Sequence, residues 1–342
     1  MPAPDAPRYA LIMPFLNESK HLPAVLESIR AQNFDHGRMY LLAVDNGSTD
    51  DGADILRAWF AAGDVGGRVV RTETRSIPHA LNCGIREAGS GDYIVRLDAH
   101  TRYDPSYVAT IAAAFERLPA DVWCVGGGQE PDHPAEFSKQ LYAALLTNRM
   151  GLGGAPYRAS AAERDVPHVY LGAWRPGVLQ RLGGFDEAWV ANEDSELNER
   201  LRDAGGRVRR IAVDSTYIVS RGALAAVRQW HRYGFWRAQT NKRHPKSRRP
   251  RHLAPPLALV GGLALLASPW RRALIPLYGL FALATIAGRR PGEAPAVTFA
   301  SCAFFPVLHA ANGLGQIRGT LAPPIASRLG ASLESLPAVE LA

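Results

Sequence analysis

The sequence predicts an α/β fold, a mostly parallel sheet with flanking helices, followed by a helical and membrane-associated C-terminal region. Over residues 9–125, short apolar runs alternate with helical patterns, which is typical of a parallel sheet covered on both faces. The charge also divides the chain: residues 1–214 hold 23 Lys and Arg against 29 Asp and Glu, but residues 215–342 hold 16 against 3. Three long apolar stretches lie in this basic part, so the chain has two physically different parts.

The expected elements of the first part follow one another in a regular order. Its first apolar run is short, as in a buried strand, and the next segment places Leu22, Val25, Leu26 and Ile29 at helical spacing. By the same two criteria we expect strands at residues 9–13, 40–44, 69–72, 93–97 and 122–125, and helices at residues 22–31, 53–61, 77–87 and 107–118.

Polar residues follow the first two expected strands, at the carboxyl ends where α/β sheets bind ligands. Pro14, Asn17 and Glu18 follow the first strand, and Asp45 begins a polar segment, residues 45–50, after the second. Taken alone, this segment fits a turn and a helix N-cap. Alternatively, Asp45 accepts hydrogen bonds from a nucleobase or a ribose. Neither strand is followed by a G-x-G-x-x-G or G-K-[ST] motif, which disfavours a dinucleotide or P-loop site.

Asp98 and His100 follow the strand expected at residues 93–97. In an extended segment, residues two apart share a face, so the carboxylate and the imidazole could bind one divalent cation, Mn²⁺ or Mg²⁺. The imidazole favours the softer of these two metals. A strand-end Asp beside an unrelated surface His is the alternative, because two ligands do not define a metal site.

Glu193 and Asp194 lie near the start of a helix that the apolar spacing from Leu197 to Leu201 predicts. Acidic residues at a helix start are ordinarily favourable to the helix dipole. A carboxylate that projects from this position into a cleft can instead act as a general base. The motif by itself leaves both interpretations open.

The basic second part indicates membrane association. Its apolar stretches, residues 253–269, 273–288 and 294–314, contain no acidic residue. The first two are a little short of the ~20 residues of a spanning helix. A mixed basic and aromatic segment, residues 228–251, precedes them and is typical of a helix at a bilayer surface. A soluble helical domain, a solvated linker or a nucleic-acid contact are the alternatives for this region.

Composition excludes several other classes of protein. With 342 residues and 47% hydrophobic residues, the chain can bury a core and is not globally disordered. Its three cysteines lie far apart with no C-x-x-C pair, which argues against a disulfide scaffold or a cysteine zinc module. Residues 1–7 and the short run after them do not form a signal peptide, so we expect the first part in the cytosol. Its net negative charge disfavours nucleic acid as a partner.

Together and in this order, the motifs resemble those of the family 2 glycosyltransferases, inverting enzymes of the GT-A fold that use a nucleotide sugar. The resemblance covers residues 9–237. It rests on residues 14–18 (PFLNE), 45–50 (DNGSTD), 80–84 (ALNCG), 98–100 (DAH), 183–186 (GGFD) and 193–194 (ED). More narrowly, residues 96–100 (RLDAH) with Tyr103, and residues 233–236 (YGFW) before a basic run and an apolar tail, look like bacterial exopolysaccharide glycosyltransferases of the succinoglycan type.

This resemblance implies a role for each matching residue. Asp194 would be the catalytic base, with Glu193 beside it as a second catalytic residue that contacts the acceptor or backbone. The implied nucleotide and donor contacts are Pro14, Asn17, Glu18, Asp45, Asn82, Asp98 and Arg232. Asp98 and His100 would hold the metal, with His100 in place of the second Asp of the usual D-x-D motif. Arg232 matches part of a Q-x-x-R-W motif in which Tyr233 replaces the Trp.

The function implied is transfer of a hexose, with UDP-glucose the typical donor, to a polyprenyl-diphosphate-linked or glycan acceptor in exopolysaccharide or cell-surface polysaccharide synthesis. The implied cofactor is Mn²⁺ or Mg²⁺, and the implied location is the cytosolic face of the cytoplasmic membrane, in contact with membrane lipids. A sugar-nucleotide nucleotidyltransferase and a non-catalytic membrane assembly protein with a degenerate transferase domain are the alternatives.

We expect four regions along the chain. These are a GT-A domain at residues 1–227, a basic aromatic interfacial helix or linker at 228–251, two to three hydrophobic membrane helices at 252–318, and a C-terminal tail at 319–342.

Overall fold

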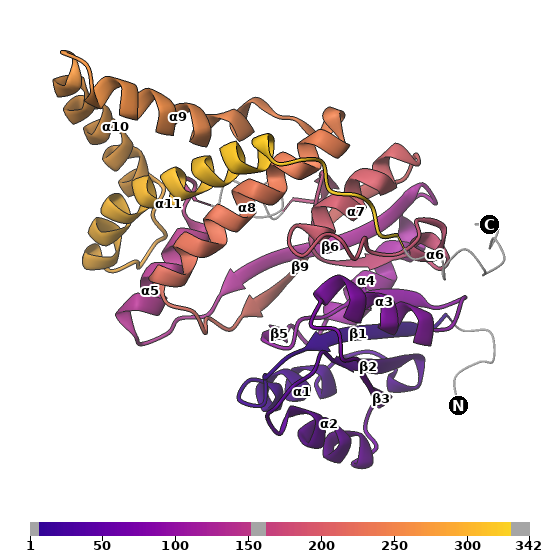
Figure 1. The fold of residues 1–342 in the computed structure, drawn as a ribbon. Helices are drawn as coiled ribbons and strands as arrows, with labels where there is room; N and C mark the ends of the chain where they lie inside the picture. Colours follow the sequence, from indigo (N-terminus) through magenta and orange to yellow (C-terminus); the bar gives the residue numbers. More distant parts are fainter. Residues whose placement is uncertain (1–6, 152–161, 330–342) are drawn as a thin grey trace. The chain divides into compact units, whose positions relative to one another are not determined.

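The computed structural model describes residues 7–151 and 162–329 (Figure 1). The chain divides into two compact units. The first unit comprises Met1–Glu130, Ser160–Ile218 and Ser327–Ala342, and the second comprises Pro131–Ala159 and Val219–Ala326. The four regional boundaries expected from the sequence stay a prediction.

A nine-stranded sheet forms the centre of the first unit. Its strand order is β3-β2-β1-β4-β8-β6-β9-β5, and β7 pairs with β9. The strands are β1 (Tyr9–Phe15), β2 (Met39–Asp45), β3 (Gly66–Arg71), β4 (Tyr93–Arg96), β5 (Thr101–Tyr103), β6 (Val122–Pro131), β7 (Arg164–Asp165), β8 (Tyr170–Trp174) and β9 (Arg207–Tyr217).

The sheet is mixed rather than mostly parallel. β1 to β4 pair in parallel, as expected from the strand–helix alternation. β8 then inserts between β4 and β6, antiparallel to both, and β5 and β7 pair antiparallel to β9. In the half of the sheet formed by β5 to β9, the sequence predicted only the start of β6, and this half pairs with β4, the strand that leads to Asp98.

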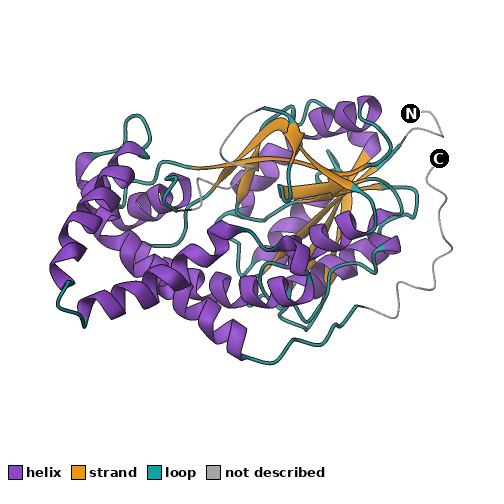
Figure 2. Cartoon of the chain, turned by 90° about the horizontal axis from the view of Figure 1, so that it is seen from above, coloured by secondary structure: helices purple, strands orange, loops and turns teal. Residues whose placement is uncertain are grey.

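Helices cover both faces of this sheet (Figure 2). The helices of the first unit are α1 (Leu22–Arg30), α2 (Gly52–Ala61), α3 (Ile77–Glu87), α4 (Tyr107–Arg117), α6 (Val178–Arg181) and α7 (Glu193–Asp203). Side chains alternate along β1: Leu11 and Met13 pack in the core that contains residues of α1, α2 and α4, whereas Ala10 and Ile12 pack in the core that contains residues of α3, α6 and α7. A strand buried on both faces explains the nearly continuous apolar run in the sequence.

The regular structure of the second unit is almost entirely helical. Its helices are α5 (Phe137–Thr147), α8 (Ala223–Arg243), α9 (Pro250–Leu266), α10 (Leu274–Ala287) and α11 (Pro295–Leu321). Glycines let α8 and α11 approach closely, because a Cβ atom at Gly234 would lie 2.1 Å from the Asn312 carbonyl oxygen and one at Gly315 would lie 2.0 Å from that of His231. Trp230 and Trp236 of α8 are buried in this packing.

Within the described part of the chain, one helix, α11, is long and apolar enough to cross a membrane. One such helix is weak evidence for a span, since 39% of its most apolar window is buried within the protein. α9 and α10 are shorter, with 17 and 14 residues, and expose most of their large apolar side chains. The three helices coincide with the three apolar stretches expected from the sequence.

Candidate active site

Two neighbouring loops, after β1 and after β2, are joined by Asn17. Asn17 adopts a left-handed backbone conformation (φ 55°), which Asn tolerates better than most residues. Its amide nitrogen donates to Ser48 Oγ (3.1 Å), and its Oδ1 accepts from the Thr49 amide (2.8 Å). The buried Asp45 accepts from the Ser48 amide through Oδ1 (2.8 Å). The first strand end is therefore fixed against the second.

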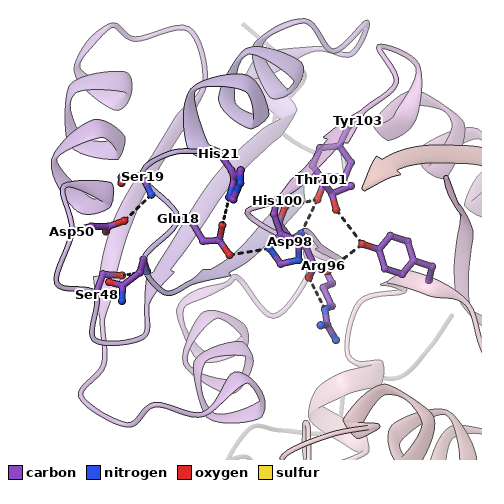
Figure 3. A network of polar contacts seen from close by, with 12 residues as sticks. Glu18, Ser19, His21, Ser48, Asp50, Arg96, Asp98, His100, Thr101 and Tyr103 are labelled. Atoms are coloured by element: carbon purple, nitrogen blue, oxygen red, sulfur yellow. Dashed lines mark hydrogen bonds and ion pairs between the residues drawn. The ribbon is translucent and has the colours of Figure 1, made fainter. Parts of the chain in front are cut away.

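Glu18 lies between two histidines (Figure 3). Its Oε1 is 3.0 Å from His100 Nδ1, and its Oε2 is 2.7 Å from His21 Nδ1. Burial alone would raise the pKa of Glu18, but the hydrogen bonds and charges of the two rings outweigh it and hold that pKa below its usual value. The loop after β1 is thus connected to His100, which follows β4.

Residues from β4, β5 and β8 hold the side chain and the backbone of Asp98. Its Oδ2 accepts from the Tyr170 hydroxyl (3.2 Å), and its Oδ1 lies 3.4 Å from Arg96 Nε. The Tyr103 hydroxyl bonds to both the amide and the carbonyl of Asp98 (2.7 and 3.1 Å). Burial, followed by the charge of Asp98, raises the pKa of Tyr103 and of Tyr170 well above the usual range, so both phenols stay protonated and can donate.

Arg96 connects Asp98 to the start of α7. Its Nη1 lies 3.1 Å from Glu193 Oε1, while its Nε faces Asp98. Burial opposes the charged form of this guanidinium, but Asp98, Glu193 and Asp194 together raise its pKa further above the usual range. Arg96 is therefore a permanent cation among three carboxylates.

Asp194 and Arg96 line the same small cavity, of about 50 Å³. Tyr170, Leu171 and Asn198 also line it. Leu171 has φ 47°, an uncommon conformation for a residue of this kind and one of the strained backbones that cluster at functional sites. The start of α7 therefore lies close to Arg96, at the end of the strand that leads to Asp98.

Glu193 and Asp194 differ in their surroundings. Glu193 is buried and paired with Arg96, and burial raises its pKa, with the charge of Asp194 adding to the shift and that of Arg96 opposing it. Asp194 faces the cavity, and its Oδ1 accepts from the Ser195 amide (2.7 Å). Both carboxylates lie in the first turn of α7, as the sequence predicts.

Comparisons with known proteins bear on the family and the fold of the chain. Residues 10–161 match the family model described as "Glycosyl transferase family 2". Residues 10–161 are a family 2 glycosyltransferase domain. The fold and the enzyme class predicted from the sequence are thereby confirmed: the chain is a glycosyltransferase.

Two relatives support this assignment, and one solved structure shows the fold. The chain is 29% identical to the succinoglycan biosynthesis protein ExoA of Rhizobium meliloti, over 81% of the chain and 83% of the relative. It is 26% identical to glycosyltransferase AglE of Haloferax volcanii, over 58% of the chain and 62% of the relative. Among solved structures, the mannosyltransferase PcManGT of Pyrobaculum calidifontis, in complex with GDP-Man and Mn²⁺, has the same GT-A fold, with a TM-score of 0.58 and 22% identity over 93% of this chain and 88% of that one.

Three further residues of the glycosyltransferase were predicted to bind the donor, and the structure describes the surroundings of each. The Asn82 side chain is fully buried and bonded to the backbone of Phe185 and to Glu187, so its geometry supports a structural role instead of donor binding. Pro14 lies within β1, paired with Val44. Arg232 is exposed on α8 of the second unit, and its donor contact stays a prediction.

The transferase site also contains residues that the sequence did not assign. Arg96 was part of the matched motif but had no role, and Tyr103 and Tyr170 bond directly to Asp98. Tyr103 lies five residues after Asp98 and was noted with the RLDAH motif, but no role was assigned to it from the sequence. Tyr170 lies 72 residues away and Glu193 lies 97 residues from Arg96, separations that a local pattern does not reveal.

Asp98 and His100 suit a cation that a bound diphosphate helps to hold. Among the described residues no cluster of three or more His, Cys, Asp or Glu side chains could hold a metal ion. A Mg²⁺-type cation, however, is usually held by only one or two carboxylates together with substrate phosphates. The Asp98 carboxylate fits this arrangement, and the His100 imidazole would be a second protein ligand, which stays a prediction.

Proposed function

We propose that this glycosyltransferase moves a hexose, UDP-glucose being the expected donor, to a lipid-linked or glycan acceptor in the synthesis of an exopolysaccharide or cell-surface polysaccharide. The observation that carries the proposal is the junction at Arg96, where Asp98, Glu193 and the cavity residue Asp194 meet. The name of the ExoA relative supports the polysaccharide product. The bound GDP-Man of the mannosyltransferase supports a nucleotide sugar as the class of donor.

In the proposed reaction, Asp194 takes the proton from the acceptor hydroxyl as its oxygen attacks the anomeric carbon of the donor. The bond between that carbon and the diphosphate oxygen breaks, and the nucleoside diphosphate leaves with inversion at the carbon. A divalent cation bound at Asp98 and His100 would supply charge neutralisation of the departing diphosphate. Asp45 and the Asn17 loop hold the nucleoside part of the donor, which fixes the donor relative to the base.

The structure favours Asp194 over Glu193 as the base. A base must reach the acceptor, and of these two carboxylates Asp194 is the one that lines the cavity. Glu193 is paired with Arg96, so its charge is committed to holding that guanidinium. We therefore assign Glu193 to positioning Arg96 and Asp98, with Asp194 as the proton acceptor.

Membrane lipids are part of the proposal, because a polyprenyl-diphosphate acceptor would lie in a bilayer. α9 and α10 expose apolar side chains along their length, and Arg271, Arg272, Arg289 and Arg290 lie at their ends. Basic residues beside apolar helices favour the cytosolic side and anionic headgroups. We accordingly place the catalytic domain on the cytosolic face of the cytoplasmic membrane.

The test is release of nucleoside diphosphate from a panel of UDP- and GDP-sugars, with membranes that carry lipid-linked sugar as acceptor. Wild-type protein should release nucleotide from one donor above the rest, and the Asp194→Asn variant should lose this activity by a factor of about 10² to 10⁴, the usual contribution of a general base. The variant should still bind the donor. Near wild-type turnover by Asp194→Asn would contradict the base assignment.

The same assay separates the alternatives. Donor binding without transfer or hydrolysis by the wild-type chain, across the whole panel, would indicate a non-catalytic assembly protein. Formation of a nucleotide sugar from a sugar phosphate and a nucleoside triphosphate would indicate a nucleotidyltransferase. EDTA should abolish the activity, and Mn²⁺ or Mg²⁺ should restore it. Activity that survives EDTA would contradict the proposed cation.

A further inference from the structure

We propose that Glu18 is a positioning residue for His100: it fixes the imidazole in the tautomer and orientation in which Nε2 serves as a ligand of the divalent cation. This inference rests on the proposed cation at Asp98 and His100. It replaces the nucleoside contact that the sequence suggested for Glu18 with a different task in the same site.

The contact geometry is that of a carboxylate holding a metal-binding histidine. Glu18 Oε1 lies 3.0 Å from His100 Nδ1, and Figure 3 shows the ring between Glu18 and Asp98. When Nδ1 donates its proton to a carboxylate, the lone pair of the neutral ring is on Nε2. Histidines that bind metals almost always donate their other ring N–H in this way.

Both partners of this contact are fixed by other bonds. The His100 carbonyl accepts from the Ile218 amide (2.9 Å), and its ring meets the Tyr217 ring edge-on at 5.4 Å. The second oxygen of Glu18 bonds to His21 Nδ1, and the Glu18 carbonyl accepts from the amides of His21 and Leu22. Both residues are thus held by several contacts, and a site whose ligands are held by such supporting contacts is pre-organised.

The residue types also predict a metal preference. An imidazole ligand is softer than the carboxylate it replaces, and Mn²⁺ accepts nitrogen ligands more readily than Mg²⁺ does. A carboxylate on Nδ1 makes the ring more basic and strengthens this preference. The pair of Glu18 and His100 should therefore give the site a higher affinity for Mn²⁺ than for Mg²⁺.

The experiment measures Mn²⁺ binding to the full chain in the presence of UDP, by the loss of the free Mn²⁺ electron paramagnetic resonance signal. Glu18→Ala should lower the Mn²⁺ affinity about 10- to 100-fold, the usual effect of removing such an outer partner. Glu18→Gln keeps an oxygen acceptor but no charge, so its loss should be smaller. His21→Ala removes the other bond of Glu18 and is the matched control, with an affinity expected within about 3-fold of wild type.

A double-mutant cycle distinguishes positioning from a general structural effect. In the His100→Ala background, Glu18→Ala should cause no further loss of Mn²⁺ affinity, because the residue that it positions is absent. Equal losses in both backgrounds would overturn the inference, as would a Glu18→Ala variant with unchanged Mn²⁺ affinity. If the wild-type chain binds no Mn²⁺ with UDP, the proposed cation and this inference fail together, whereas a failure of Glu18 alone leaves the proposed cation standing.

Discussion

Asn82 offers the sharpest separation between a structural and a donor-binding role. Its side chain is fully buried, donates to the Phe185 carbonyl (2.8 Å) and to Glu187 Oε1 (3.0 Å), and accepts from the Phe185 amide (2.8 Å). These bonds attach α3 to the loop before α7. We predict that Asn82→Ala destabilises the fold and leaves the donor affinity of the folded enzyme unchanged.

The magnitude follows from the groups that lose their partner. Phe185 is buried, so its amide and carbonyl would each be left without the Asn82 bond, at about 1–3 kcal/mol per buried group. Glu187 keeps its bond to His79 and adds little. The expected loss in the free energy of unfolding is therefore about 2–6 kcal/mol. In a unit of this size, each kcal/mol lost lowers Tm by roughly 2–4 °C.

The assay pairs thermal unfolding of the purified protein with donor titration at a temperature where the variant is folded. Gln32→Ala is the matched control, because Gln32 is also buried and makes three hydrogen bonds, to Ser28, Asp104 and Val108. It should give a similar loss of stability and the same donor KM as wild type. An Asn82→Ala variant with wild-type Tm and a donor KM raised tenfold or more would refute the structural role.

Two further predictions concern pH and the membrane. Burial alone would raise the pKa of Glu187, but hydrogen bonds from Asn82 and His79 lower it, so its contribution to stability is present above about pH 4.3, the usual value for Glu, and is lost as the pH falls through the lowered value. Glu187→Gln should therefore flatten the fall in the free energy of unfolding between about pH 5 and pH 3, measured with urea, and an unchanged slope would contradict this. Changing the basic residues just before and at the start of α9 to Gln should move the protein toward the soluble fraction at high salt, and unchanged partitioning would assign the anchoring to the apolar helices alone. These basic residues are Lys246, Arg248, Arg249 and Arg251.

The elements found from the sequence are those whose apolar spacing is set by burial on one or both faces. The helix at residues 77–87 was predicted with the bounds of α3, because Ala80, Leu81 and Ile85 form its buried face. β8 was not predicted, since it has five residues, one of them Gly172, and follows a long segment without periodicity. Its antiparallel place between β4 and β6 depends on partners far along the chain.

In the candidate site too, the residues visible in the local sequence could be predicted, and those that depend on long-range contacts could not. Asp98 and Asp194 could be selected because a carboxylate at a strand end or a helix start is visible in the local sequence. Their long-range contacts could not, because Tyr170 reaches Asp98, and Arg96 reaches Glu193 beside Asp194, only in the folded sheet. Glu18 was selected for the nucleoside pocket, and the contact that redefines it, with His100, spans 82 residues.

The charges around Arg96 support the proposed cation independently of the two predicted ligands. One guanidinium faces the carboxylates of Asp98, Glu193 and Asp194, so this part of the site is negative before any donor binds. A nucleoside diphosphate brings further negative charge to the same place, and unpaired like charges in a buried site are costly. Burial, and beyond it the charge of Asp194, raises the pKa of Glu193 against the opposing charge of Arg96. A divalent cation that arrives with the donor would offset the negative charge of the diphosphate, so that the Arg96 guanidinium could stay paired with Glu193.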